Sequence, residues 1–423
     1  MSSRLRPPPS SRAAALLAAA LTTAALLARA APATAAPRDF TAEVRALFAV
    51  AACGDPPPAG YDAATAAAHC KELGKPIAAW QKQWRDLAAP FFRDLLSGKY
   101  PPAIVYPFGG GDLSTLLVVY PDATEYTTLS LEGMGDPRPL TALGSCGTAC
   151  APGAPGAPGA KDAAARARRL AGELAKVRQL VGPNLGWAWN TTIQLSIDSS
   201  ETGLGLPGIL TLTLVALEAS GYEPLEARYF ALAEGGAIRY LEQADIDAWD
   251  ASVAAARPGK RKATNAVQEG AFNNIELVFR KKGDPAAPKK TFRHVTGDLS
   301  DAGLAAKGAP LAHLAQKRDI AAMTKAASYL LWRPEFGKLR DYLLGSMKHM
   351  ISDDTGIPPR YAGPAGFTSD VWGTYTGPFF DWARKYPAAG EMIQLFRGNK
   401  RPMPFRFGYY DAAKRPLLMH VHK

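Results

Sequence analysis

The sequence is short of cysteine and of long apolar runs. It has four cysteines among 423 residues, and no segment after residue 35 approaches the roughly 20 apolar residues that span a membrane. We therefore predict no transmembrane segment beyond residue 35, and the chain is not a peptide-scale disulfide scaffold. Three common catalytic patterns are also missing, namely Gly-x-Ser-x-Gly, His-Glu-x-x-His and Gly-x-x-x-x-Gly-Lys-[Ser/Thr]. Their absence disfavours serine-hydrolase, zinc-protease and P-loop interpretations.

Acidic residues are fewer than basic ones. The chain has 49 lysines and arginines against 38 aspartates and glutamates, which gives a formal net charge of +11. Part of this surplus lies in the first 35 residues, which contain arginine but no acid. The rest is too modest to indicate a nucleic-acid partner, and a solvated basic surface explains it. An anionic envelope component or lipid head group stays open as an alternative partner.

The first 35 residues have the pattern of a signal peptide. Three arginines stand within the first 12 residues, residues 13–28 are apolar, and Ala33-Thr34-Ala35 fits the small-x-small cleavage pattern. We expect residues 1–35 to be removed and the protein to be exported to the periplasm or beyond. Export would separate the protein from the soluble nucleotide cofactors of the cytosol.

The cysteines stand at positions 53, 70, 146 and 150. An even number of cysteines in an oxidising compartment indicates disulfides, and proximity favours Cys53 with Cys70 and Cys146 with Cys150 among three connectivities. The spacing is poor for zinc. His420 and His422 alternate on a predicted strand and share a face, but the sequence offers no third ligand, so no metal site is predicted.

Alternating strand and helix patterns predict an α/β protein. Residues 103–106 and 126–131 have strand composition, with a glycine loop and a short helix between them. We expect a Rossmann-like mixed sheet with flanking helices and a disulfide-stapled helical segment before it, with an α+β fold as the alternative. Ala-Pro-Gly triplets predict a linker or long loop over residues 146–165. It would separate residues 36–145 from residues 166–423, which are either the rest of the same domain or a second domain.

Several further elements follow from periodicity and composition. Residues 77–96 and 336–351 have apolar residues at helical spacing. Residues 275–279 and 291–295 indicate a hairpin, and residues 405–409 and 417–421 suggest a closing antiparallel pair.

The stretch from Tyr106 to Asp112 is the most specific candidate site. A strand, a glycine turn, a helix and an acid about 20 residues onward is the arrangement that holds a nucleotide ribose in Rossmann-type folds, and Glu132 supplies such an acid. The glycines do not follow Gly-x-Gly-x-x-Gly, so a purely structural turn, a pocket for another ligand, and a nucleotide or S-adenosylmethionine site all stay open. The cofactor is thus undetermined. The ligand-binding candidates are Tyr106, Phe108, Gly109, Gly110 and Gly111.

A pair of adjacent acids, Asp353 and Asp354, follows the predicted helix 336–351. Neighbouring carboxylates can raise one another's pKa and divide acid and base roles, or hold a hard cation. A helix-ending turn with exposed acids is the simpler interpretation. The catalytic candidates are Asp112, Glu132, Asp353 and Asp354.

Six short blocks together resemble a family of exported bacterial proteins. The blocks are Tyr106-Pro107-Phe108-x-Gly110-x-Asp112, Tyr120-Pro121, Leu131-Glu132, Ser328-Tyr329-Leu330, Asp353-Asp354-Thr355-Gly356-Ile357-Pro358 and Phe407-Gly408-Tyr409. Relatives have serine where this chain has Gly109 and Thr355. The resemblance covers most of the chain after residue 35 and implies that these blocks belong to one fold. It implies no activity and gives no residue a role.

The sequence thus favours an exported α/β protein that binds an unknown small ligand or envelope component at the glycine loop. Two alternatives stay open. One is an exported hydrolase that uses its acidic residues, and the other is a Rossmann-like relative of the methyltransferases.

Overall fold

The computed structural model describes residues 36–144, 160–187, 203–255, 270–378, 381–408 and 415–423. The chain divides into two units, Met1–Pro37 and Arg38–Lys423, and the fold below is that of the second unit. The predicted signal peptide, Cys146, Cys150 and most of the predicted linker lie outside the described residues.

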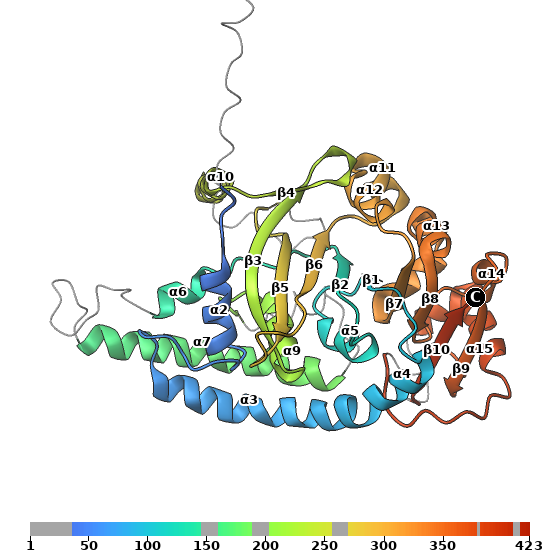
Figure 1. Cartoon of the computed structure of the whole chain (residues 1–423), viewed down its shortest axis with the longest axis horizontal. Helices are drawn as coiled ribbons and strands as arrows, with labels where there is room; N and C mark the ends of the chain where they lie inside the picture. The colour runs from blue at the N-terminus through green and yellow to red at the C-terminus, as the bar shows by residue number, and fades with distance from the viewer. Residues whose placement is uncertain (1–35, 145–159, 188–202, 256–269, 379–380, 409–414) are drawn as a thin grey trace, which may run out of the picture. The chain divides into compact units, whose positions relative to one another are not determined.

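The described residues form a ten-stranded mixed sheet flanked by helices (Figure 1). Its strands are β1 (Ala103–Pro107), β2 (Glu125–Ser130), β3 (Tyr222–Leu232), β4 (Ile238–Tyr240), β5 (Asn274–Lys281), β6 (Lys290–Thr296), β7 (Ile320–Thr324), β8 (Met347–Ser352), β9 (Thr368–Gly373) and β10 (Leu417–His422). Their order in space is β4-β3-β5-β6-β2-β1-β7-β8-β10-β9.

Five neighbouring strands are parallel and form the centre of the sheet. β1 lies between β2 and β7, β2 also pairs with β6, and β7 pairs with β8. In chain order these five strands read 3-2-1-4-5, which is the order of doubly wound Rossmann sheets. The predicted α/β class with a Rossmann-like mixed sheet is therefore confirmed.

Antiparallel strands complete both edges of the sheet. β10 is antiparallel to β8 and to β9. On the other side β5 is antiparallel to β6 and to β3, which confirms the hairpin predicted for residues 275–279 and 291–295. Because β3 and β6 are both antiparallel to β5, β3 runs in the same direction as the parallel strands. The carboxyl ends of β3 and β6 therefore lie at the same edge.

Helices cover both faces of the sheet. The α-helices among the described residues, with one π turn, are α2 (Thr41–Val50), α3 (Ala63–Gln83), the π turn η1 (Trp84–Ala88), α4 (Ala89–Leu96), α5 (Leu113–Val119), α6 (Pro139–Gly144), α7 (Ala160–Trp187), α9 (Gly208–Ala219), α10 (Gln243–Ala255), α11 (Asp301–Ala306), α12 (Ala309–Ala315), α13 (Gly337–Ser346), α14 (Pro359–Ala362) and α15 (Pro387–Phe396). The 3-10 segments in the same part of the chain are η3 (Glu234–Gly236), η4 (Ala326–Trp332), η5 (Pro334–Phe336) and η6 (Asp381–Lys385).

Side chains that alternate along the strands divide the core in two. Ile104 on β1 and Ile351 on β8 pack with the helices α2 to α5, α7 and α9. Their neighbours Val105 and Met350 pack with α11 to α15 on the other face. This alternation is what strand geometry dictates, and helices on both faces explain why the parallel strands are apolar throughout.

The helical segment before β1 is held by a disulfide, as the sequence predicted. Cys53 and Cys70 are bonded, with their Cα atoms 5.4 Å apart. The bond joins the turn after α2 to the first half of α3, whose N-terminus is capped by the Asp62 side chain accepting from the Thr65 amide. Within the described residues no helix is long and apolar enough to cross a membrane.

Two predicted elements are wrong. The helix expected over residues 336–351 ends at Ser346, and Met347–Ser352 form strand β8 beside β7. The strand expected near residues 405–409 is not formed by Phe405 or Phe407, whose rings pack on the α3–α4 helical segment, and β10 pairs with β8 and β9 instead.

Candidate functional site

The glycine loop after β1 makes a tight turn that needs small residues. Phe108 has φ 62° and Gly110 has φ 28°, both in the left-handed region. At Gly109 a Cβ atom would lie 2.3 Å from the Tyr106 ring, so any side chain there would clash. Residues 108–111 are buried, and the turn places Asp112 directly before helix α5.

Asp112 is the N-cap of α5 and the centre of a polar cluster. Its Oδ1 accepts from the Thr115 amide at 3.3 Å and from the Thr115 hydroxyl at 2.7 Å. Its Oδ2 accepts from the Tyr106 hydroxyl at 3.2 Å and from Lys325 Nζ at 2.6 Å. The carboxylate is thus occupied by donors of the chain itself.

Lys325, which follows β7, is a residue that sequence reasoning missed. Its side chain is only 1% exposed, and Nζ also donates to Thr115 Oγ1 at 2.9 Å. The rings of Trp84 and Phe407 lie 5.6 and 5.4 Å from Nζ, within cation–π range. The only signal in the sequence was a lysine that directly ends an apolar run.

Asp353 is buried and anchors the loop after β8. Its Oδ2 accepts from the Ala326 amide at 3.1 Å, and its Oδ1 accepts from the amide and hydroxyl of Thr355 at 2.8 and 2.5 Å. Ala326 has φ 54°, so the carboxylate stabilises a strained backbone. Gly408 packs so closely that a Cβ atom there would lie 2.2 Å from Asp353 Oδ2.

Asp354 is 2% exposed and faces the buried Tyr375. Burial, and then the charge of Asp354, raise the pKa of the Tyr375 hydroxyl far above its usual value. The tyrosine therefore stays protonated at any physiological pH.

Glu132 follows β2 and lies beside a buried histidine. Its Oε2 accepts from Ser130 Oγ at 2.7 Å, and its backbone carbonyl lies 2.8 Å from His294 Nε2. Because a carbonyl only accepts, His294 Nε2 donates to Glu132, and Nδ1 lies 3.1 Å from Thr128 Oγ1. Burial lowers the pKa of His294 to about 4, so the ring is neutral at pH 7.

All four acids chosen from the sequence follow carboxyl ends of parallel strands. Asp112 and Asp353 are brought together through consecutive residues, since Lys325 binds the first and the Ala326 amide binds the second. Asp354 follows Asp353, and Glu132 lies at the end of β2, on the other side of β1. The four acids therefore lie in polar loops at one edge of the sheet, and doubly wound proteins bind their ligands at this edge.

A cavity of about 460 Å³ opens at this edge, where β6 and β3 end. Its polar lining includes Asn273, Asn274, Thr296, Asp298 and Lys307, and its apolar lining includes Leu232 and Pro310. Asp298 is exposed and is fixed by the Ser300 amide, which donates to Oδ1 at 2.9 Å. Sequence reasoning missed Asp298, although Gly297-Asp298 shortly after the predicted strand 291–295 indicated a loop at its carboxyl end.

A second cavity of about 300 Å³ adjoins the loop after β2. Gly133, Asp136 and Arg138 line it from that loop, and Trp249 and Asp250 line it from α10. Asn273 lines both cavities, so they are neighbours.

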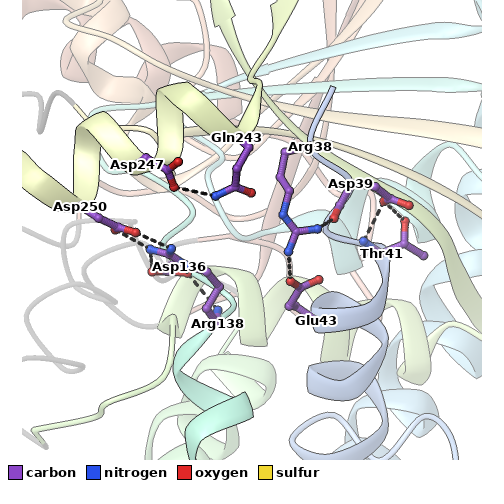
Figure 2. A network of polar contacts seen from close by, with 9 residues as sticks. All are labelled: Arg38, Asp39, Thr41, Glu43, Asp136, Arg138, Gln243, Asp247 and Asp250. Atoms are coloured by element: carbon purple, nitrogen blue, oxygen red, sulfur yellow. Dashed lines mark hydrogen bonds and ion pairs between the residues drawn. The ribbon is translucent and has the colours of Figure 1, made fainter. Parts of the chain in front are cut away.

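Arg138 links the loop after β2 to α10 (Figure 2). Its guanidinium pairs with Asp136 at 2.7 Å and with Asp250 at 2.7 Å, and it lies over the Phe272 ring. Hydrogen bonds to the carboxylates of Asp250 and then Asp136 raise the pKa of Arg138 further above its usual value. Figure 2 also shows Arg38 directed toward Glu43 and the Asp39 carbonyl. The Asp39 carboxylate accepts from the hydroxyl of Thr41 at the start of α2.

The terminal strand places three histidines together. The ring centroids of His420 and His422 are 4.7 Å apart, and His349 on β8 lies 5.3 Å from His420. His422 Nε2 lies 3.0 Å from an oxygen of Asp370. Within the part of the chain that the structure describes, no group of three or more histidines, cysteines or acids is arranged to hold a metal ion.

Comparison with family models, with curated proteins and with solved structures returned no match to this chain. The strand order and pairing themselves define an α/β protein with a doubly wound parallel centre.

Proposed function

We propose that this chain is an exported binding protein that holds a small polar ligand at the carboxyl edge of its parallel strands. The observation on which the proposal depends is the 460 Å³ cavity at the ends of β6 and β3, in a sheet of Rossmann order. In such sheets ligands bind outside the carboxyl ends of the strands, and pockets of about 300–1,000 Å³ hold small ligands.

The lining of the cavity favours a nucleoside-like ligand. Asp298 is a carboxylate that accepts hydrogen bonds, which suits the amino or hydroxyl groups of a base or a sugar. Leu232 and Pro310 provide the apolar contacts that a planar ring needs. Glu132 follows β2, the strand next to β6, which is the place where Rossmann folds keep the acid that binds ribose.

The ligand site that the sequence predicted at residues 106–112 stays a prediction. Lys325 and Asp112 fill the space in front of α5 with their own ion pair, and α5 has only seven residues. The loop after β1 therefore supports the edge, and the open volume lies farther along the sheet, at the ends of β6 and β3. The glycine loop and the cavity lie on the same carboxyl edge of the sheet, and we propose that the ligand binds at this edge.

A thermal-shift titration tests this proposal. The protein is titrated with adenosine, S-adenosylmethionine and neutral sugars, because a ligand that binds only the folded state raises the melting temperature. At a hundredfold excess over its Kd the expected stabilisation is about 2.7 kcal/mol. An increase in melting temperature with adenosine that is lost in Asp298→Asn supports the site. An increase with neutral sugars but not with adenosine would contradict a nucleoside ligand.

A second candidate, a relative of the methyltransferases, is favoured by the far edge of the sheet. Leaving aside the inserted strands β3 to β5, the order of the remaining strands is 3-2-1-4-5-7-6, with the reversed strand β10 between β8 and β9. Rossmann-like methyltransferases share this strand order, so this candidate depends on analogy of fold. Stabilisation by S-adenosylmethionine well beyond that by adenosine would favour this candidate over simple nucleoside binding.

The hydrolase alternative is less well supported by the geometry. Asp353 gives both carboxylate oxygens to donors of its own loops, and Asp112 caps a helix and pairs with Lys325. These are positions in which a carboxylate stabilises structure, and a general base needs a lone pair aimed at its substrate.

A further inference from the structure

A third cavity, of about 270 Å³, lies at the opposite edge of the sheet. Pro121, which precedes β2, and Tyr222, which begins β3, line it, so it belongs to the amino ends of these strands. The rest of its wall comes from the α3–η1–α4 segment, from α5, and from the turn after α9. It is separate from the edge at which the proposed function is placed.

A π turn gives this cavity its polar wall. Gln81, Arg85, Ala89 and Arg93 line it at a regular spacing of four residues. In a continuous α-helix each step of four residues drifts by about 40°, so Arg93 would point about 120° away from Gln81. The π turn Trp84–Ala88 takes in one extra residue and cancels most of this drift. Such turns often occur at functional sites, and here the turn aligns two arginines.

The cavity combines positive charge with apolar walls. Among the described residues Arg85 pairs only with its neighbour Asp86, and both side chains are more than half exposed, so this pair is weak and readily replaced. Trp80, Leu117 and Tyr222 provide apolar and aromatic surface. Ser220 Oγ is buried in this wall and has no hydrogen-bond partner among the described residues, which is a cost that a bound acceptor or donor would remove.

We propose that this cavity binds a small carboxylate with an apolar body. The carboxylate would accept from Arg85 and Arg93, and planar guanidinium groups suit a carboxylate better than a point charge does. The apolar body would pack against Trp80, Leu117 and Tyr222. The cavity volume equals that of about nine molecules in liquid water, so a ligand the size of benzoate or hexanoate fits.

Calorimetric titration of the whole protein with hexanoate and benzoate tests the site. Hexanamide and benzamide serve as matched ligands, because they keep the apolar body and remove the charge. We expect the carboxylates to bind at least tenfold more tightly than the amides. Equal affinity for both, or no heat with either carboxylate at millimolar concentration, would overturn the proposal.

Two variants and one control place the binding in this cavity. Arg93→Gln is expected to weaken hexanoate binding at least tenfold with an unchanged melting temperature, and Ala89→Phe to abolish binding by filling the cavity. Arg318→Gln removes an exposed arginine elsewhere and should leave the affinity unchanged. An equal loss in Arg318→Gln would identify non-specific charge attraction and overturn the site, as would unaltered binding in Ala89→Phe. Inorganic phosphate that binds as tightly as hexanoate would contradict the apolar part of the proposal.

Discussion

The ammonium of Lys325 lies 2.6 Å from the carboxylate of Asp112, across the boundary between β1 and β7. In a sheet of order 3-2-1-4-5 this boundary is where the connections change face, and it is where Rossmann proteins open a crevice. Here the chain closes that point with its own buried ion pair. The pair fixes the glycine loop against the loop after β7.

Lys325→Met is expected to destabilise the protein by about 3–5 kcal/mol, because it leaves the Asp112 carboxylate without its partner in a buried site. Urea unfolding measures the change. The double variant Lys325→Met with Asp112→Asn should recover part of the loss, since no unpaired charge remains. A loss below about 1 kcal/mol in the single variant would mean that the pair is solvated and weak.

Gly109→Ala is expected to cost about 1–3 kcal/mol, because the new Cβ would overlap the Tyr106 ring. Gly74→Ala is the matched control, since a Cβ on Gly74 within α3 meets nothing within 4 Å. That control should stabilise the protein by about 0.5–1 kcal/mol through helix propensity. Equal effects of the two substitutions on the unfolding midpoint would refute the tight packing of the glycine loop.

Removal of the Cys53–Cys70 disulfide in a double alanine variant should cost about 3 kcal/mol. The bond closes a loop with a sequence separation of 17, and in the chain-entropy description such a loop constrains the unfolded state by about this amount. Thermal melts with and without a reductant check the result. A wild-type protein whose melting temperature does not change on reduction would contradict it.

Stability should fall as the pH drops from about 7 to 5. Burial lowers the pKa of His294 and His349 to about 4 and of His420 to about 3, and neighbouring histidines add to the effect at His349 and His420. A histidine in the unfolded chain titrates near 6.5, so the unfolded state binds more protons throughout this interval and the free energy of unfolding decreases. The loss levels off only below the folded pKa values.

The decrease is measured by urea unfolding at several pH values. Carboxylates with lowered pKa values, such as Glu125 and Glu276, lose their contribution only below about pH 4.5. Burial raises the pKa of Glu218, which acts in the opposite direction, so a net decrease between pH 7 and 5 reports the histidines. His420→Phe should make the free energy of unfolding less dependent on pH, because it removes one histidine that takes up a proton on unfolding. A profile that is flat in the wild-type protein would contradict the burial of these rings.

Local patterns in the sequence were enough to predict the elements around β1. The apolar run 103–106, the glycines after it and the strand 126–131 each follow from nearest neighbours, and the structure forms them in that order. Strand β8 was missed because Met347–Ser352 continues the helical spacing of α13. A parallel strand that is buried on both faces has no alternation to separate it from a helix.

The candidate site was only partly predictable for a similar reason. Asp112 stood out because it follows a glycine turn, but its partner Lys325 lies 213 residues later in the sequence. Asp298 lines the 460 Å³ cavity only because β5 pairs with β6 and β3 pairs with the other side of β5. Both relationships depend on sheet order, which no local pattern in one sequence specifies.

The most direct test of the proposed function is calorimetric titration of adenosine into the wild-type protein, Asp298→Asn and Asp94→Asn. Asp298→Asn keeps the oxygen that accepts from the Ser300 amide and removes the charge in the cavity. Asp94 is exposed on α4 and serves as the control. We predict binding to the wild-type protein and to Asp94→Asn, and at least tenfold weaker binding to Asp298→Asn. Equal affinity for all three proteins, or no binding to any of them, would contradict a nucleoside site at the carboxyl edge.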